Sequence, residues 1–242
     1  MNTKEFLQRA LADSGLYCLL ALKSSENRRV QKFYDSVDEL IAEANNLDSA
    51  GYDTYFALST FKDGSSRKVG NINYIQSFFL DLDCGPLKEF ASQQEALDGL
   101  REFYRGANLP KPLVVSSGRG IHVYWFLSEP VTYDDWFPVA DRLKKLCAEY
   151  DFLADPAVTS DGARVLRILG THNHKDDPAA QVYQLGIELP PLVDFEKFSV
   201  LIGSDPLASP TKVGSQPPSA IMQKLMGNND TKFKNILLKT HD

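Results

Sequence analysis

Two aspartates stand two positions apart in the apolar stretch SFFLDLDCG, residues 77–85. In a β-strand, residues two apart project from the same face, so Asp81 and Asp83 would lie side by side. Burying two like charges is costly unless a cation or a proton compensates them. Mg²⁺ and Mn²⁺ prefer oxygen ligands, so the pair predicts a divalent-metal site at a strand end. The alternative is a solvated strand end, or a pair matched to arginine or lysine.

The stretch VVSSGRGIHVYWFL (114–127) places a tight glycine turn between two apolar strands. Gly118 and Gly120 flank Arg119, and such a turn can present backbone N–H groups and a guanidinium to a phosphate. His122 follows on the polar-tolerant face of the second strand. If that strand lies beside the first stretch, His122 faces the same cavity as the two aspartates. The alternative for His122 is a half-buried histidine with satisfied hydrogen bonds.

A third stretch, DPAVTSDGARVLRILGTHNHK (155–175), combines acids with several cations. Its candidate site residues are Asp155, Asp161, Arg164, Arg167, Asn173 and Lys175. Two arginines three positions apart, with a lysine nearby, favour binding of a triphosphate over packing in a core. The alternative is a pair of surface arginines on an edge strand.

Together, FLDLD, SGRGIHVYW and the third stretch resemble the archaeo-eukaryotic primase superfamily, and most of all the primase–polymerases of phages and mobile elements. The motifs occur in the family's order, over roughly residues 50–185. The resemblance implies an α+β fold, with an RRM-like catalytic sheet flanked by helices and an N-terminal α/β subdomain. It also implies a nucleotidyltransferase, a DNA primase or primase–polymerase, that synthesises primers on single-stranded DNA during replication. Such an enzyme joins NTPs or dNTPs with the help of two Mg²⁺ or Mn²⁺ ions.

Roles for single residues follow from the resemblance as well. Asp81, Asp83 and Asp155 match the catalytic, metal-binding acids, and Asp161 is the weaker candidate for the third acid. The predicted nucleotide-binding residues are Ser117, Gly118, Arg119, His122, Arg164, Arg167, Asn173 and Lys175. The chain has Leu169-Gly170-Thr171 where many relatives have Pro-Gly-Thr or Pro-Gly-Ser. No cluster of zinc ligands is visible in the sequence, so zinc is not expected.

The composition limits how the protein can bind nucleic acid. The net charge is −6, with 26 Lys+Arg against 32 Asp+Glu, so binding must depend on a local basic cleft or on metal ions. We therefore expect weak template affinity, and a helicase or a C-terminal accessory domain is a candidate partner. Three dispersed cysteines without a CxxC motif indicate a reducing compartment. With no signal peptide and no apolar run of membrane-spanning length, the sequence predicts a cytoplasmic protein, in the host cytoplasm if phage-encoded.

The domain organisation predicted from the sequence has three parts. Residues 1–200 form the catalytic domain, residues 201–219 a linker rich in Pro, Ser and Gly, and residues 220–242 a helical segment that begins a further C-terminal domain. The alternative for the last segment is that it packs on the catalytic core. Periodicity predicts helices at 3–11, 36–47, 92–104 and 132–150, and strands at 16–22, 30–34, 54–61, 77–83, 112–116, 121–127, 164–169 and 181–186.

Two other functions are alternatives to a primase. In THNHK (171–175), His172 and His174 have the spacing of a metal-binding pair, as in HNH or HUH-type nucleases. That hypothesis leaves the acid pair and the SGRG turn unexplained. The second is a nucleotide- or DNA-binding module without catalysis, with any activity residing in a C-terminal part.

Overall fold

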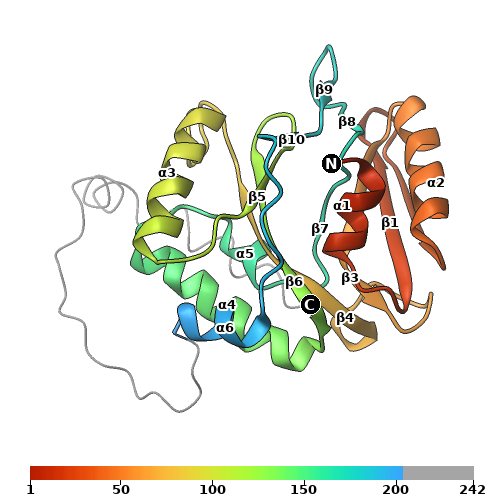
Figure 1. The fold of residues 1–242 in the computed structure, drawn as a ribbon. Coiled ribbons are helices and arrows are strands. Elements are labelled where there is room, and N and C mark those ends of the chain that lie inside the picture. Colours follow the sequence, from red (N-terminus) through yellow and green to blue (C-terminus); the bar gives the residue numbers. More distant parts are fainter. Residues whose placement is uncertain (204–242) are drawn as a thin grey trace, which may run out of the picture. The chain divides into compact units, whose positions relative to one another are not determined.

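The computed structural model describes residues 1–203 (Figure 1). Apart from its first three residues, the predicted linker at 201–219 lies outside the described residues, as does the predicted helical segment at 220–242.

The described residues form α-helices and short and long strands in a mixed order. The helices are α1 (Thr3–Ala10), α2 (Val37–Ser49), α3 (Gln93–Gly106), α4 (Tyr133–Glu149), α5 (Pro156–Thr159) and α6 (Phe195–Leu201), with 3₁₀ turns at Ser24–Glu26 and Val69–Asn71. The strands are β1 (Leu16–Lys23), β2 (Arg28–Tyr34), β3 (Asp53–Phe61), β4 (Ile72–Leu82), β5 (Leu113–Ser116), β6 (Ile121–Val131), β7 (Val165–Arg167), β8 (His172–Asn173), β9 (Ala180–Gln181) and β10 (Tyr183–Leu185).

A large antiparallel sheet organises the protein, with the strand order β10-β5-β6-β4-β3-β1-β2. The short strand β7 also pairs with β3, while β8 and β9 form a separate two-stranded ribbon. The N-terminal strands β1 to β3 continue the sheet through the pairing of β3 with β4. The α+β class and the large sheet flanked by helices, both predicted from the sequence, are confirmed.

Local sequence signals explain where the main elements begin. The hydroxyl of Ser36 accepts a hydrogen bond from the backbone N–H of Glu39, and Ser92 does the same for Glu95, so both predicted helix starts are confirmed. The predicted strand at 77–83 ends one residue early, at Leu82. Asp83 therefore lies just beyond β4, where its side chain is about half exposed to solvent rather than buried beside Asp81.

Aromatic side chains join the sheet to its helices. Phe6 of α1 makes edge-on contacts with Phe56 of β3 and Tyr124 of β6, at ring-centroid distances of 5.6 and 5.1 Å. Phe78 of β4 stacks on Phe198 of α6 at 4.8 Å. Figure 1 shows α2 near β1 at one end of the sheet and α3, α4 and α6 at the other. These contacts pack α1 and α6 against the sheet.

Among residues 1–203, the helices are all too short or too polar to cross a membrane.

Candidate active site

Asp81 and His122 lie opposite each other on neighbouring strands. β4 pairs with β6 in a register that places Asp81 against His122, and the carboxylate Oδ1 is 3.8 Å from the ring Nε2. Directly opposed residues of an antiparallel pair project from the same face of the sheet. Asp155, the N-cap of α5, joins them because its backbone N–H donates a hydrogen bond to the carbonyl oxygen of Asp81 at 3.0 Å. Three residues far apart in the sequence thus meet at the end of β4.

The charges at this strand end are unbalanced. Burial, with the negative charges of Asp83 and Asp155, raises the pKa of Asp81 to about 7. Burial and the positive charge of Arg167 lower the pKa of His122 to about 3, so its ring is neutral near pH 7. The ring Nδ1 of His122 lies 3.4 Å from the hydroxyl of Tyr124. The contact between Asp81 and His122 is therefore not an ion pair at neutral pH, and no lysine or arginine of residues 1–203 forms an ion pair with Asp81.

The carboxylates of Asp81, Asp83 and Asp155 are suitable ligands for a divalent metal, but they are not arranged around a common point. Lys88 holds the carboxylate of Asp83 in an ion pair at 2.6 Å. Asp155 accepts a hydrogen bond from the backbone N–H of Ala157 at 2.8 Å. Within residues 1–203, no three acidic, histidine or cysteine side chains are gathered as a formed metal site. Asp81 nevertheless carries a charge that its neighbours disfavour, and oxygen donors are what Mg²⁺ and Mn²⁺ prefer, so the residues suit such an ion once Asp83 leaves Lys88.

The SGRG turn closes directly onto the end of β4. Gly118 adopts φ +95°, a left-handed conformation that favours glycine, and a Cβ at Gly120 would collide with the carbonyl oxygen of Leu82. Gln93, the first residue of α3, fastens the turn from behind. Its Nε2 donates to the hydroxyl of Ser116 at 2.9 Å and to the carbonyl oxygens of Gly118 and Gly120 at 3.2 and 3.0 Å. Gln93 thus positions the turn, a role that local sequence pattern does not reveal.

Arg167 occupies a buried ion pair rather than an exposed edge. Its Nη1 lies 2.6 Å from Oδ1 of Asp53, and both side chains are almost fully buried. The guanidinium also lies over the ring of Tyr55, 4.9 Å from its centroid. Arg167 also lines an open cleft, and its ion pair with Asp53 holds the guanidinium in one orientation there.

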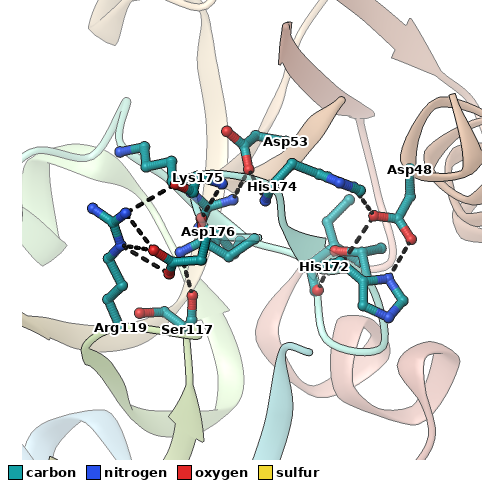
Figure 2. A network of polar contacts seen from close by, with 12 residues as sticks. Asp48, Asp53, Ser117, Arg119, His172, His174, Lys175 and Asp176 are labelled. Carbon is teal, nitrogen blue, oxygen red and sulfur yellow. Dashed lines mark hydrogen bonds and ion pairs between the residues drawn. The ribbon is translucent and has the colours of Figure 1, made fainter. Parts of the chain in front are cut away.

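Polar contacts tie the SGRG turn to the segment after β7 (Figure 2). Arg119 Nε donates to Asp176 Oδ2 at 2.9 Å, and its Nη2 donates to the carbonyl oxygen of Lys175 at 3.0 Å. Asn173 donates from its side-chain amide to the carbonyl oxygen of Ser117 at 3.0 Å. Hydrogen bonds therefore join the SGRG turn to the segment 173–176.

These residues border a single open cleft with a volume of about 370 Å³. Of the predicted site residues, it is lined by Asp81, Asp83, Ser117, Arg119, His122, Arg164, Arg167, Asn173 and Lys175. Gly118 and Asp155 lie outside this lining. Asp155 nevertheless adjoins the cleft through its contact with Asp81 and through Arg164, whose Nη2 is 3.7 Å from its Oδ2. The structure thus brings together residues from all three stretches.

No family model and no curated protein matches the sequence. Solved structures do resemble the fold. The archaeo-eukaryotic primase domain of the cyanophage S-2L primase–polymerase superimposes with a TM-score of 0.56 at 16% identity, over 78% of this chain and 89% of that one. The catalytic domain of the primase RepB′, solved with initiator DNA, gives a TM-score of 0.52 at 15% identity, over 84% of this chain and 92% of that one. The chain has the fold of the archaeo-eukaryotic primases.

Within this primase fold, the cleft extends beyond the residues that the sequence suggested. Its further lining includes Leu20, Leu22, Tyr55, Arg67 and Asp161. The sequence predicts Asp161 only as the weaker candidate for the third acid and assigns no role to the other four. Tyr55 and the leucines come from apolar strands with no chemical signal, and Arg67 comes from a polar loop with several cations.

The two histidines of THNHK share one carboxylate in the primase fold (Figure 2). Asp48, near the end of α2, accepts a hydrogen bond from the backbone N–H of His172 at 2.9 Å. Its two oxygens also lie 2.8 Å from Nδ1 of His172 and 2.9 Å from Nε2 of His174. Asp48 therefore fastens the segment that carries Asn173 and Lys175 onto α2.

Replacing Asp48 with alanine should lower the free energy of unfolding by about 2–3 kcal/mol, because several hydrogen bonds to one largely buried carboxylate are lost together. Urea unfolding at pH 7.5 measures the change. Asp38→Ala is the matched control on the same helix, because Asp38 is exposed and, among residues 1–203, forms an ion pair only with Lys4, at 2.7 Å. It should change stability by less than about 0.5 kcal/mol. Equal losses in the two variants would contradict the role of Asp48.

Proposed function

We propose that this protein is a nucleotidyltransferase that synthesises primers on single-stranded DNA, using NTPs or dNTPs as substrates. One observation carries the proposal. The carboxylate of Asp81 and the ring of His122 face one cleft, which the SGRG turn and several cations also line, in a chain with the fold of the archaeo-eukaryotic primases.

The acids would hold the cations that the reaction needs. Asp81, Asp83 and Asp155 are the candidate ligands for two Mg²⁺ or Mn²⁺ ions, which, when bound, would favour deprotonation of the attacking hydroxyl and neutralise phosphate charge. The reaction joins the 3′-oxygen of one nucleotide to the α-phosphorus of the next. The bond from that phosphorus to the β-phosphate oxygen breaks, pyrophosphate leaves, and the 3′-hydroxyl loses its proton.

The cationic side chains of the cleft would bind the triphosphate. Arg119 and Lys175 supply positive charge, and the neutral ring of His122 can donate one hydrogen bond to a phosphate oxygen. Because Arg119 is held by Asp176 and Arg167 by Asp53, these guanidinium groups are oriented before the nucleotide arrives. Preorganised donors of this kind stabilise developing negative charge without a cost of reorientation.

The partners follow from the same proposal. Single-stranded DNA is the template, and a helicase or a C-terminal accessory domain would add template affinity that a chain of net charge −6 lacks. The biological setting would be DNA replication, in a phage or mobile element.

One assay tests the proposed activity against its rivals. The full chain is incubated with single-stranded DNA, labelled NTPs or dNTPs, and Mg²⁺ or Mn²⁺. New oligonucleotides are the expected product. Cleavage of the DNA, abolished by His172→Ala or His174→Ala, would favour the nuclease instead. Binding of DNA and nucleotide without either product would favour the non-catalytic module.

His122 gives a more specific prediction. His122→Ala should raise the KM for the nucleotide about tenfold, since one hydrogen bond to a charged phosphate is lost. The affinity for Mn²⁺ in the absence of nucleotide should change much less, because His122 is assigned to the nucleotide. Tyr124→Phe is the control, because it removes the hydroxyl beside the ring and keeps His122. Unchanged nucleotide affinity in His122→Ala would refute the assigned role.

A further inference from the structure

Arg67 lines the cleft, as do Leu20 and Leu22 of β1. It belongs to the connection between β3 and β4. Its side-chain Nε is buried, and no residue of the described part, 1–203, accepts a hydrogen bond from it. Burial lowers the pKa of the Arg67 guanidinium. A buried N–H without an acceptor is costly in a protein, and such groups call for an explanation.

The neighbours of Arg67 are mostly cations. Arg164 and Arg29 both disfavour its positive charge, and Asp161 is the nearby acid that favours it, together with the weakly acidic Cys18. Asp161 is itself engaged, because its Oδ1 accepts a hydrogen bond from the backbone N–H of Ala163 at 3.0 Å. Arg164 also lies 3.7 Å from Asp155, so the three guanidinium groups face two carboxylates, which leaves an excess of positive charge.

The strand register extends this positive region out of the cleft. Leu22 and Leu20 of β1 line the cleft and pair with Arg29 and Gln31 of β2. Opposed residues share a face, so Arg29 and Gln31 continue the same surface toward the sheet edge. The other face of β2 belongs to α2, as the ion pair between Lys32 and Glu43 shows. The surface of β1 and β2 beside Arg67 thus extends from the cleft to the sheet edge at β2.

A purely structural arginine would be bonded to protein groups, as two other arginines of the cleft are. Arg167 pairs with Asp53, and Arg119 pairs with Asp176. Arg67 differs from both because its Nε lacks an acceptor within residues 1–203. The missing partner is most simply an anion that enters the cleft from outside.

We propose that Arg67, with Arg164 and Arg29, forms a second phosphate-binding subsite, separate from the proposed triphosphate site at the SGRG turn. The ligand chemistry is a phosphate of nucleic acid, and it has two sources. One is the backbone of the single-stranded template that crosses β1 and β2. The other is the triphosphate of a second nucleotide that takes the place of a primer. The choice between these sources rests on the proposed function, whereas phosphate binding itself can be measured without catalysis.

The first arm of the test measures binding of a fluorescent oligo-dT to the full chain across a salt series. Arg67→Ala should weaken binding about five- to tenfold and reduce the slope of log K against log[salt] by about 1, the result of losing one phosphate contact. Arg67→Lys should recover part of the affinity. Lys68→Ala is the matched control, because it removes an exposed cation from the same connection that does not line the cleft.

The second arm measures binding of ATP and dATP without DNA, at concentrations that fill both subsites. If the source is a second nucleotide, Arg67→Ala weakens one of two binding events and leaves the affinity for oligo-dT unchanged. If Arg67→Ala unfolds in a thermal melt, Arg67→Gln, which keeps the aliphatic stem, replaces it. Unchanged affinity for both oligo-dT and nucleotides would overturn the subsite. Failure of the wild type to make oligonucleotides would overturn the proposed function and leave these binding results standing.

Discussion

Asp81→Asn is expected to reduce nucleotide incorporation about 10³-fold or more, because Asp81 is one of the proposed metal ligands and such a carboxylate supplies several kcal/mol of transition-state stabilisation. The substitution keeps the size of the side chain and removes its charge. Asp83→Asn should cause a loss of similar size, although Asp83 lies beyond the strand and is paired with Lys88. Primer extension at saturating Mn²⁺, followed on a sequencing gel, measures the loss.

Asp161 provides the matched control for this experiment. It lines the same cleft, and its side chain accepts a hydrogen bond from the backbone N–H of Ala163, which an asparagine can also accept. Asp161→Asn should therefore change incorporation by less than about threefold, as is usual for a group outside the reacting set. Asp155→Asn should behave like Asp81→Asn, because Asp155 is the assigned third acid. A large loss in Asp161→Asn with a small one in Asp155→Asn would reverse that assignment.

Asp81→Asn should also make the metal-free protein more stable than the wild type at pH 8. Asp81 has a pKa of about 7, raised from 3.8 by burial and by its acidic neighbours. Below about pH 4, the carboxyl is protonated in both the folded and unfolded states, and it costs nothing. Between about pH 4 and 7, it ionises in the unfolded state first, so this group makes the protein progressively less stable as the pH rises.

The expected size follows from the raised pKa. The difference between the folded and unfolded values corresponds to about 4 kcal/mol at most, since one pKa unit is about 1.4 kcal/mol. The Asp81 side chain is 22% exposed, and solvent screening reduces the electrostatic cost of its charge. We therefore expect Asp81→Asn to raise the free energy of unfolding by about 2 kcal/mol. For a domain of this size, that gain raises Tm by roughly 4–8 °C.

Thermal melts across the pH range, with EDTA and with Mn²⁺, test this prediction. The two proteins should melt together near pH 4, and the variant should be the more stable at pH 8 in EDTA. Added Mn²⁺ should stabilise the wild type and affect the variant less, which reverses their order or closes the gap. A variant that melts at or below the wild type at pH 8 in EDTA would show that Asp81 is not under electrostatic strain.

Local sequence patterns were sufficient for the elements that position the site. Alternation of polar and apolar residues predicted the strands that carry Asp81 and His122, because side chains in a strand alternate between two faces. The serine N-caps at Ser36 and Ser92 predicted the starts of α2 and α3, because the capping bond joins residues only three apart. The fold class was predicted from the resemblance of the three motifs to the archaeo-eukaryotic primases.

The sequence alone determined which residue types reach the end of β4 and the turn that follows β5. Only the tertiary structure decided how their charges are balanced. Asp53 pairs with Arg167 across 114 positions, and Asp48 holds His172 from 124 positions away. Arg67 lies in a loop with no periodic signal, and its proposed role depends on the lack of an acceptor for its Nε within residues 1–203. Such pairings depend on how the strands assemble, and a local pattern carries no information about that assembly.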